Sequence, residues 1–378
     1  MKIHRDISEK IEELLIPGKV LVLYGPRQVG KTTLVRELQA KMVYRSKFYS
    51  GDELIYSEPF SIQSRQSFDE LVGDSELIII DEAQRIPNIG INLKILVDNN
   101  PKLRIIATGS ASFELANKIS EPLTGRKLTL TLYPLSYREM QKTRGIVEAR
   151  HLLERWMIWG GYPEIVSIDD LVNRERLMNE IVNSYLYHDL LELEDIRRSN
   201  KINALLKLLA FQIGSTVSIA ELARTLGLNF QTVQRYLELL EKVFVIFRVE
   251  GFSRNLRKEI TKSPRFYFYD LGVRNCVIQN FNPIDLRSDV GQIWENYLMV
   301  ERLKSNQIHD RFGNSFFWRT YNQKEIDLVE ERQGKLVGYE FKYGDGNIRK
   351  ATRDEFLENY PGSNLITINW KNFEEFVL

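Results

Sequence analysis

The sequence predicts an α/β fold whose amino-terminal part is a parallel sheet flanked by helices. Short β-branched runs at 20–24, 77–80 and 103–107 alternate with helix-like segments, which is typical of such a sheet. The run at 77–80 is apolar at every position, as expected of a strand that is buried on both faces. Residues 1–138 are therefore predicted to form one α/β domain.

The remaining chain is predicted to hold three further modules. A length of 378 residues exceeds what one ordinary core accommodates, so several domains are expected. We expect a helical lid at 139–199, a winged helix-turn-helix module at 200–284 and a carboxyl-terminal α/β domain at 285–378. The last of these reads as a helix, three strands, a helix and a final strand.

Composition excludes several classes of protein. With 43% apolar and 27% charged residues the chain is of ordinary globular type rather than disordered or fibrous. The single cysteine, Cys276, excludes an internal disulfide framework and a cysteine-based zinc site. No apolar run is long enough to span a membrane, and the charged amino terminus does not resemble a signal peptide. We expect a soluble cytoplasmic protein without a membrane partner.

The near-neutral total charge of +1 conceals two segments of opposite sign. Residues 139–196 hold 12 Asp and Glu against 6 Lys and Arg, a net charge of −6. Residues 197–265 hold 13 Lys and Arg against 5 Asp and Glu, a net charge of +8. A basic module of this kind is a candidate for contact with nucleic acid.

The strongest motif lies between the predicted strand at 20–24 and the predicted helix at 32–39. It matches G-x-x-x-x-G-K-[ST], whose backbone N–H groups curl around phosphates where a Cβ would block the approach. Lys31 is expected to reach the β- and γ-phosphates, and Thr32 to bind Mg²⁺ through its hydroxyl. The expected nucleotide contacts are Gly25, Pro26, Arg27, Gln28, Val29, Gly30, Lys31, Thr32 and Thr33. The domain is thus predicted to be a P-loop NTPase with ATP and Mg²⁺ as cofactors.

Polar residues at two later strand ends complete the predicted nucleotide site. Asp81 is expected near Mg²⁺, and Glu82 is positioned to orient or deprotonate the attacking water, which favours hydrolysis over binding alone. Thr108 or Ser110 would sense the γ-phosphate if their strand neighbours that of Asp81; otherwise they form an ordinary strand-end turn. Arg126 is a candidate to contact the γ-phosphate, either in the same molecule or across subunits of an oligomer.

Several runs resemble a bacterial and archaeal family of AAA-type ATPases that carry a carboxyl-terminal domain of unknown function. The runs are GPRQVGKTTL, LIIIDEAQRIP, ATGSAS, LTGR and PLSYREM, followed by GGYPE at 160–164 and YHD at 187–189. The resemblance covers essentially the whole chain and implies an AAA-type fold with ATP as the nucleotide. It supplies no substrate, and it assigns no role to Gln84 and Arg85, which belong to the family pattern.

The basic segment has the pattern of a winged helix. Two apolar-periodic helices meet at Gly227 and Asn229, which are suited to end one helix and cap the next. The second helix would expose polar residues near its amino-terminal half, as in a helix that reads the major groove. These residues are Gln231, Thr232, Gln234 and Arg235, and the connector between the two wing strands bears Arg254, Arg257, Lys258 and Lys262. The two interpretations are contact with duplex DNA and packing against the ATPase as a regulatory domain.

The last module carries a second set of reactive side chains. Glu295 lies in a predicted helix, Asp327 in a strand, and Glu340 and Lys342 on one face of the next strand. The order of elements and the spacing D-x₁₂-E-x-K resemble the PD-(D/E)xK nuclease superfamily, with a restriction-endonuclease-like fold, although Ile326 replaces its proline. That resemblance implies that Asp327 and Glu340 hold Mg²⁺ while Lys342 helps activate water. A domain that binds DNA without cutting it is the alternative.

Three functional hypotheses follow. The first is a DNA-associated ATPase, and the second is an ATP-driven switch that acts on protein partners; a slow, isolated ATP-binding protein is a third. The four histidines show no metal-ligand spacing and are interpreted as surface or structural residues, with His188 inside the 187–189 landmark.

Overall fold

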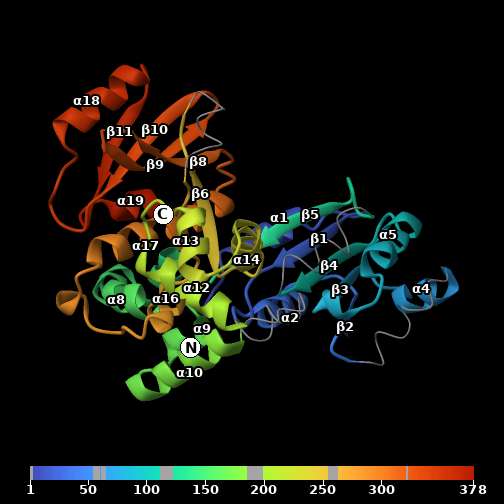
Figure 1. The fold of residues 1–378 in the computed structure, drawn as a ribbon. Coiled ribbons are helices and arrows are strands. Elements are labelled where there is room, and N and C mark those ends of the chain that lie inside the picture. Colours follow the sequence, from blue (N-terminus) through green and yellow to red (C-terminus); the bar gives the residue numbers. More distant parts are fainter. Residues whose placement is uncertain are drawn as a thin grey trace. The chain divides into compact units, whose positions relative to one another are not determined.

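A computed structural model describes residues 3–53, 60, 65–110, 122–184, 199–253, 263–320 and 322–378. The chain divides into two compact units (Figure 1). The first comprises His4–Pro134 with Lys242–Phe244, and the second chiefly Leu135–Glu241 and Val245–Leu378. The predicted boundary at 138 therefore lies close to the observed one. The three modules predicted beyond it all lie within the second unit, and their division stays a prediction.

The first unit contains the predicted parallel sheet, with strand order β2-β3-β4-β1-β5. All neighbouring strands run parallel. The strands are β1 (Val20–Tyr24), β2 (Ser46–Ser50), β3 (Leu77–Asp81), β4 (Arg104–Gly109) and β5 (Lys127–Thr131). The helices are α1 (Ile7–Leu14), α2 (Lys31–Lys41), α4 (Arg65–Val72) and α5 (Ile89–Asn99), with the short η1 (Ala83–Arg85). Because β3 and β4 are neighbours, the polar residues that follow them meet at one edge of the sheet.

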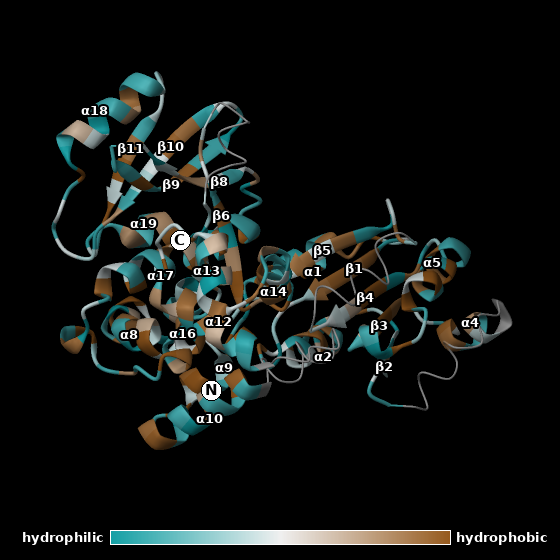
Figure 2. Cartoon of the chain, viewed as in Figure 1, coloured by the Kyte–Doolittle hydropathy of each residue, from teal (hydrophilic) through white to brown (hydrophobic). Residues whose placement is uncertain are grey.

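The core of this unit explains why the strand runs are so apolar. Every residue of β1 and β3 is buried, and β1 appears hydrophobic along its length in Figure 2. Apolar side chains of α4 and α5, among them Phe68 and Leu93, pack in the same cluster as strand residues such as Val22 and Ile80. In a strand covered on both faces no side chain faces water, so polar residues do not alternate with apolar ones. This accounts for the uninterrupted apolar run at 77–80.

The second unit begins with a helical part that lies where the lid and the helix-turn-helix were expected. Its helices are α7 (Tyr137–Arg144), α8 (Ile146–Trp159), α9 (Pro163–Ser167), α10 (Leu171–Ser184), α12 (Ser199–Phe211), α13 (Ile219–Leu226), α14 (Phe230–Lys242) and α16 (Leu271–Val277). The short α16 packs against both α8 and α10, and all of its residues are buried. The predicted lid helices are thus joined to the middle of the chain through one internal helix.

The turn between α13 and α14 follows the residues that predicted it. Gly227 takes the left-handed conformation that ends α13, with φ of 62°. The Asn229 side chain accepts a hydrogen bond from the Thr232 N–H at 2.7 Å, and the Ser218 side chain accepts one from the Glu221 N–H at 3.3 Å. Both helices therefore begin with a side-chain cap; the cap at Asn229 was predicted from the sequence, and the one at Ser218 was not.

A second, six-stranded sheet has the order β11-β10-β9-β8-β6-β7. The strands are β6 (Ile246–Gly251), β7 (Arg265–Phe268), β8 (Asn314–Arg319), β9 (Glu325–Arg332), β10 (Lys335–Phe341) and β11 (Asn364–Ile368). Helices α17 (Val290–Ile308), α18 (Lys350–Asn359) and α19 (Phe373–Val377) accompany it, with the short η3 (Ile284–Leu286). The predicted order of one helix, three strands, a helix and a strand is present, and α19 follows it.

This sheet crosses the module boundary that was predicted at 284. The antiparallel pair β6–β7, expected as a wing, is joined to the carboxyl-terminal strands because β6 pairs in parallel with β8. The middle and last modules consequently share one sheet. Among the described helices, none is both long and apolar enough to cross a membrane.

Candidate functional site

The predicted phosphate-binding loop connects the buried end of β1 to the start of α2. Gly25 lies so close to the next segment that a Cβ at this position would collide with the carbonyl oxygen of Leu132. Gly30 has φ of 92° and Gln28 has φ of 60°, so the backbone turns through left-handed conformations before α2 begins at Lys31. This curled backbone at a helix amino terminus is suited to bind an anion.

The Lys31 amine lies over this loop. It is buried and donates hydrogen bonds to the carbonyl oxygens of Gly25 at 2.9 Å and Pro26 at 2.8 Å. A cation held at the mouth of a curled backbone is placed to meet phosphate oxygens. That Lys31 binds the β- and γ-phosphates stays a prediction.

Asp81 is the centre of a hydroxyl–carboxylate cluster at the carboxyl edge of the sheet. The Thr32 hydroxyl donates to its Oδ2 at 2.7 Å, and the Thr108 hydroxyl donates to its Oδ1 at 2.5 Å. The Glu82 N–H donates to the Thr108 hydroxyl oxygen at 3.1 Å. A hydroxyl and a carboxylate side by side are the hard oxygen donors that Mg²⁺ prefers, so this pair fits the ion that the motif implies.

Glu82 is oriented by a residue to which the sequence assigned no role. The Gln84 amide nitrogen donates to Glu82 Oε2 at 2.6 Å and to the Ser110 hydroxyl at 3.2 Å. Glu82 itself has φ of 49°, a conformation uncommon outside glycine, which turns the chain directly after β3. Gln84 thus links the carboxylate at the end of β3 to the hydroxyl at the end of β4. The sequence had pointed to Gln84 only through its place in the family pattern.

The contact of Arg5 with the phosphate-binding loop was not predicted from the sequence. Its guanidinium donates to the carbonyl oxygen of Val29 in the loop at 2.8 Å and to that of Tyr133 at 2.5 Å. These partners lie 24 and 128 residues away along the chain. No local pattern connects such distant positions, so sequence reasoning had no signal for this contact.

Arg126 does not lie near the loop of its own molecule. It precedes β5, whose first residue pairs with Val20, whereas the loop follows Tyr24 at the other end of β1. Four residues of strand separate the two ends, about 13 Å. The Arg126 Nε instead donates to Asp98 at 2.6 Å. The expected contact within one molecule is therefore wrong, because Arg126 lies at the opposite edge of the sheet. A contact across subunits stays a prediction.

Comparison with known families identifies this first part of the chain. A model described as an AAA domain matches residues 17–141, which include the loop and both polar strand ends. The chain carries an AAA-type P-loop ATPase domain. Two domains of unknown function, DUF8612 and DUF4143, match residues 150–283 and 290–374. The expected succession of an AAA-type ATPase and a carboxyl-terminal domain of unknown function is confirmed.

Relatives extend the similarity beyond the ATPase domain. An uncharacterized protein of Mycobacterium tuberculosis is 29% identical over 348 residues, which cover 89% of this chain and 73% of the relative. One of Methanocaldococcus jannaschii is 25% identical over 399 residues, covering 98% and 87%. Among solved structures, a Walker-type ATPase of Pyrococcus abyssi superposes with a TM-score of 0.48 at 18% identity, over 72% of this chain and 95% of the other. The alignment with the Methanocaldococcus jannaschii relative thus spans nearly the whole of this chain.

The second predicted site lies outside the ATPase domain, and the structure brings its four residues together. Glu295 comes from α17, Asp327 from β9 and Glu340 from the end of β10, and Lys342 directly follows β10. The Lys342 amine donates to Glu340 Oε1 at 2.6 Å, so the two side chains are in contact. The Asp327 Oδ2 accepts a hydrogen bond from the Phe341 N–H at 2.8 Å.

A buried arginine that sequence reasoning missed lies among these carboxylates. Arg265 of β7 forms ion pairs with Glu295 at 3.1 Å, with Glu325 at 2.7 Å and with Asp327 at 3.6 Å. The Tyr267 hydroxyl also donates to Glu295, at 2.7 Å. In the described parts of the chain, no three or more Asp, Glu, His or Cys side chains are arranged to hold a metal ion. The Arg265 guanidinium thus lies among the carboxylates that were predicted to hold Mg²⁺, and that metal role stays a prediction.

Burial dominates the electrostatics of the cluster. Burial, and then the charge of Asp327, raise the pKa of Glu295 to about 8, against the opposing effect of Arg265. The same two causes raise the pKa of Glu340 to about 7, although Lys342 lowers it. Burial also raises the pKa of Asp327. Strongly perturbed carboxyl groups of this kind concentrate at functional sites and also in buried ion-pair networks.

In the helix expected to read DNA, two of the four residues predicted to be exposed are so, and Thr232 is half-buried. Gln231 and Arg235 of α14 are exposed, and Gln234 is half-buried with its amide donating to Glu238 at 3.3 Å. Val233 and Tyr236 are buried, as the helical period predicted. The basic connector with Arg254, Arg257, Lys258 and Lys262 lies outside the described residues.

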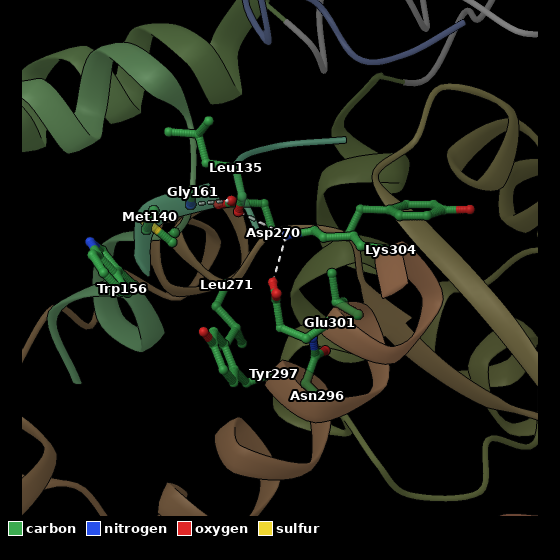
Figure 3. Close-up of a pocket in the computed structure, with 13 residues that line it drawn as sticks. Leu135, Met140, Trp156, Gly161, Asp270, Leu271, Asn296, Tyr297, Glu301 and Lys304 are labelled. Carbon is green, nitrogen blue, oxygen red and sulfur yellow. Dashed lines mark hydrogen bonds and ion pairs between the residues drawn. The ribbon is translucent and has the colours of Figure 1, made fainter. Parts of the chain in front are cut away.

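The landmark at 160–164 has a structural explanation. The Gly161 N–H donates to the buried carboxylate of Asp270 at 2.7 Å (Figure 3). A Cβ on Gly160, whose φ is 77°, would collide with that carboxylate. Lys304 beside it donates to Glu301 at 2.7 Å and to the Leu135 carbonyl oxygen at 3.0 Å. The small pocket that these residues line has a volume of about 20 Å³, which holds little more than one water molecule. This motif therefore serves packing rather than ligand binding. The landmark at 187–189, including His188, lies outside the described residues.

Proposed function

We propose that the protein hydrolyses ATP with Mg²⁺ at the loop between β1 and α2. The observation that carries the proposal is the contact of 2.7 Å between the Thr32 hydroxyl and Asp81, with Lys31 over the adjacent loop. This arrangement offers hydroxyl and carboxylate oxygens for a divalent cation directly beside donors for phosphate oxygens. When bound, Mg²⁺ would neutralise developing negative charge on the phosphates.

The roles of the protein's own residues follow from their positions. Lys31 and the loop N–H groups would bind the phosphates, and Thr32 with Asp81 would hold Mg²⁺. Glu82 follows Asp81 directly, so its carboxylate is the candidate to orient the attacking water. Thr108 forms hydrogen bonds with both the Asp81 carboxylate and the Glu82 N–H. It is therefore placed to fix the positions of these two acidic residues relative to each other.

Two substitutions separate binding from hydrolysis. Lys31→Ala removes a phosphate ligand and should abolish both ATP affinity and turnover. Glu82→Gln keeps the shape of the side chain but removes the base, so ATP affinity should remain while turnover falls roughly 100-fold or more. Nucleotide affinity and phosphate release measure the two effects, with Glu76→Gln as a matched carboxylate control on the exposed surface of the same unit. Normal turnover in Glu82→Gln would show that another residue orients the water.

A second candidate function is binding of duplex DNA by the helix-turn-helix region. Its support is the net charge of +8 over 197–265 and the exposed Gln231 and Arg235 on α14. Binding should then weaken steeply with salt, and Arg235→Ala should reduce the salt slope by about 1. Fluorescence anisotropy with a labelled duplex measures both quantities. No binding at low salt would favour the alternative of a switch that acts on protein partners.

A further inference from the structure

We propose that Arg5 is a positioning residue for phosphate binding. Its guanidinium fixes the peptide group between Val29 and Gly30, so that the Gly30 N–H is held ready for a phosphate oxygen. The inference rests on the proposed binding of ATP at this loop, and it adds a residue that lies outside the loop motif. The ligand that Arg5 affects is the phosphate chain of the nucleotide, not its base or sugar.

The Arg5 guanidinium makes its two backbone contacts through different nitrogens. Nη1 donates to the Val29 carbonyl oxygen at 2.8 Å, and Nη2 donates to the Tyr133 carbonyl oxygen at 2.5 Å. A guanidinium is planar and offers its donors in a rigid fork, so binding two carbonyl groups at once leaves it little freedom. Arg5 therefore connects the phosphate-binding loop to the segment that follows β5.

Helix α1 holds Arg5 in place. The Arg5 carbonyl oxygen accepts a hydrogen bond from the Ser8 N–H at 3.0 Å, in the first turn of this helix. Ile7 and Ile11 of α1 are buried, so the start of the helix cannot shift without exposing apolar surface. The guanidinium thus reaches the loop from an anchored backbone.

The segment after β5 also holds the other end of the loop. The Leu132 N–H donates to the Tyr24 carbonyl oxygen at 2.7 Å, and the Leu132 carbonyl oxygen is the atom with which a Cβ on Gly25 would collide. Leu132 therefore fixes the loop where it leaves β1. Tyr133 fixes it through Arg5 just before α2 begins. Two consecutive residues thus support both ends of the loop.

The contact with Val29 sets the direction of the next N–H group. The described peptide bonds are all trans, and in a planar trans peptide the C=O of one residue and the N–H of the next point in opposite directions. Because Arg5 binds the Val29 carbonyl oxygen, the Gly30 N–H points away from Arg5. Within the described parts of the chain this N–H has no hydrogen-bond acceptor. A directed donor of this kind, immediately before α2, is suited to an anionic oxygen.

The expected effect of Arg5 is on affinity, not on the chemical step. Without the guanidinium the Val29–Gly30 peptide would be free to rotate, and phosphate binding would have to order it. A hydrogen bond from a charged donor changes an equilibrium by about 10-fold to 100-fold. Lys31, Asp81 and Glu82 are oriented by other groups, so hydrolysis of bound ATP should change little.

Calorimetric titration of the full chain with Mg²⁺-ADP and with inorganic tripolyphosphate tests the inference, together with phosphate release from ATP. Arg5→Met keeps much of the side-chain volume but has no donor. It should weaken both ligands about 10-fold to 100-fold and raise the KM for ATP likewise, while kcat changes by less than about 3-fold. Arg5→Lys keeps the charge and should recover part of the affinity.

Lys19→Met is the matched control. Lys19 also donates to a backbone carbonyl oxygen of the same unit, that of Gly125 at 2.5 Å, but it lies just before β1, away from the loop. This variant should bind ADP and tripolyphosphate like the wild type. A general loss of stability in the unit would affect both variants, whereas loss of the directed N–H affects only Arg5→Met.

Three results would overturn the inference. A folded Arg5→Met protein with wild-type affinity for both ligands would do so and leave the proposed function intact. A lower kcat at unchanged affinity would place the effect of Arg5 on the chemical step instead. A wild-type chain that binds neither ligand would refute both proposals. If circular dichroism shows that Arg5→Met is unfolded, Arg5→Lys takes its place, with an expected loss of about 3-fold to 10-fold, and wild-type affinity would then contradict the role of Arg5.

Discussion

At the scale of single residues, the ATPase domain depends on side chains that orient other side chains. Thr108 and Gln84 do not themselves match a phosphate or metal motif, yet they bond to Asp81 and Glu82. Such contacts fix the direction of a carboxylate, and small errors in that direction reduce the rate of a reaction that requires aligned water. Gln84 is the clearer case, because its amide reaches both Glu82 and Ser110.

Gln84→Ala should lower the turnover of ATP about 10-fold to 100-fold while the KM for ATP changes little. The reason is that Glu82 would lose the donor that orients its carboxylate, whereas the phosphate-binding loop would stay intact. Steady-state kinetics of phosphate release measure both constants. Gln39→Ala is a matched control, since Gln39 bonds to Ser46 in the same unit. A rise in KM as large as the fall in turnover would show that Gln84 supports binding instead.

At the scale of elements, a buried ion pair attaches α17 to the second sheet. Arg302 donates from Nε to Glu330 Oε1 at 3.0 Å and from Nη2 to Oε2 at 2.7 Å, and its Nη1 donates to the Phe376 carbonyl oxygen at 2.8 Å. Burial opposes ionisation of Glu330, but the hydrogen bonds and charge of Arg302 outweigh it and hold the pKa of Glu330 below its ordinary value of 4.5. One side chain thus joins α17, β9 and α19.

Glu330→Gln should destabilise the second unit by about 3–5 kcal/mol at neutral pH, because it leaves Arg302 buried without its charge partner. A carboxyl group whose pKa is depressed by folding stabilises the protein above its unfolded pKa and loses that effect as pH falls through the folded pKa. The difference between wild type and variant should therefore be constant near neutral pH and shrink as pH falls below about 4.5. Denaturant unfolding at several pH values measures it, with Glu331→Gln as the control from the same strand. A difference that does not depend on pH would contradict the ionic interpretation.

The helices, strands and turns differ in how well the sequence predicts them. The loop, β3 and the α13–α14 turn carry local signals, since glycine, buried apolar runs and caps act on their immediate neighbours. Arg265 gave no such signal. Arg265 follows Pro264 in a basic segment, where it resembles the other basic residues of the predicted wing. Its partners Glu295 and Glu325 lie 30 and 60 residues further along the chain. The pairing of β6 with β8 is equally non-local, and it joins two modules that composition had separated.

At the scale of the whole molecule, two compact units with separate cores predict two unfolding transitions. Saturation with Mg²⁺ and ATP should move only one of them, because a ligand stabilises the unit that binds it by RT ln(1 + [L]/Kd). At a ligand concentration 100 times Kd this amounts to about 2.7 kcal/mol, or roughly 10 °C for a unit of this size.

Differential scanning calorimetry with and without Mg²⁺-ATP measures this shift. Three variants then show which unfolding transition belongs to the unit that binds ATP. Glu82→Gln should keep the shift, because it binds ATP without hydrolysing it during the scan. Lys31→Ala should lose the shift, because the loop no longer holds the phosphates. Arg265→Gln should lower the other transition and leave the nucleotide-dependent one unchanged. A single transition that moves as a whole with Mg²⁺-ATP would show instead that the units unfold cooperatively, so that nucleotide binding stabilises residues far from the loop.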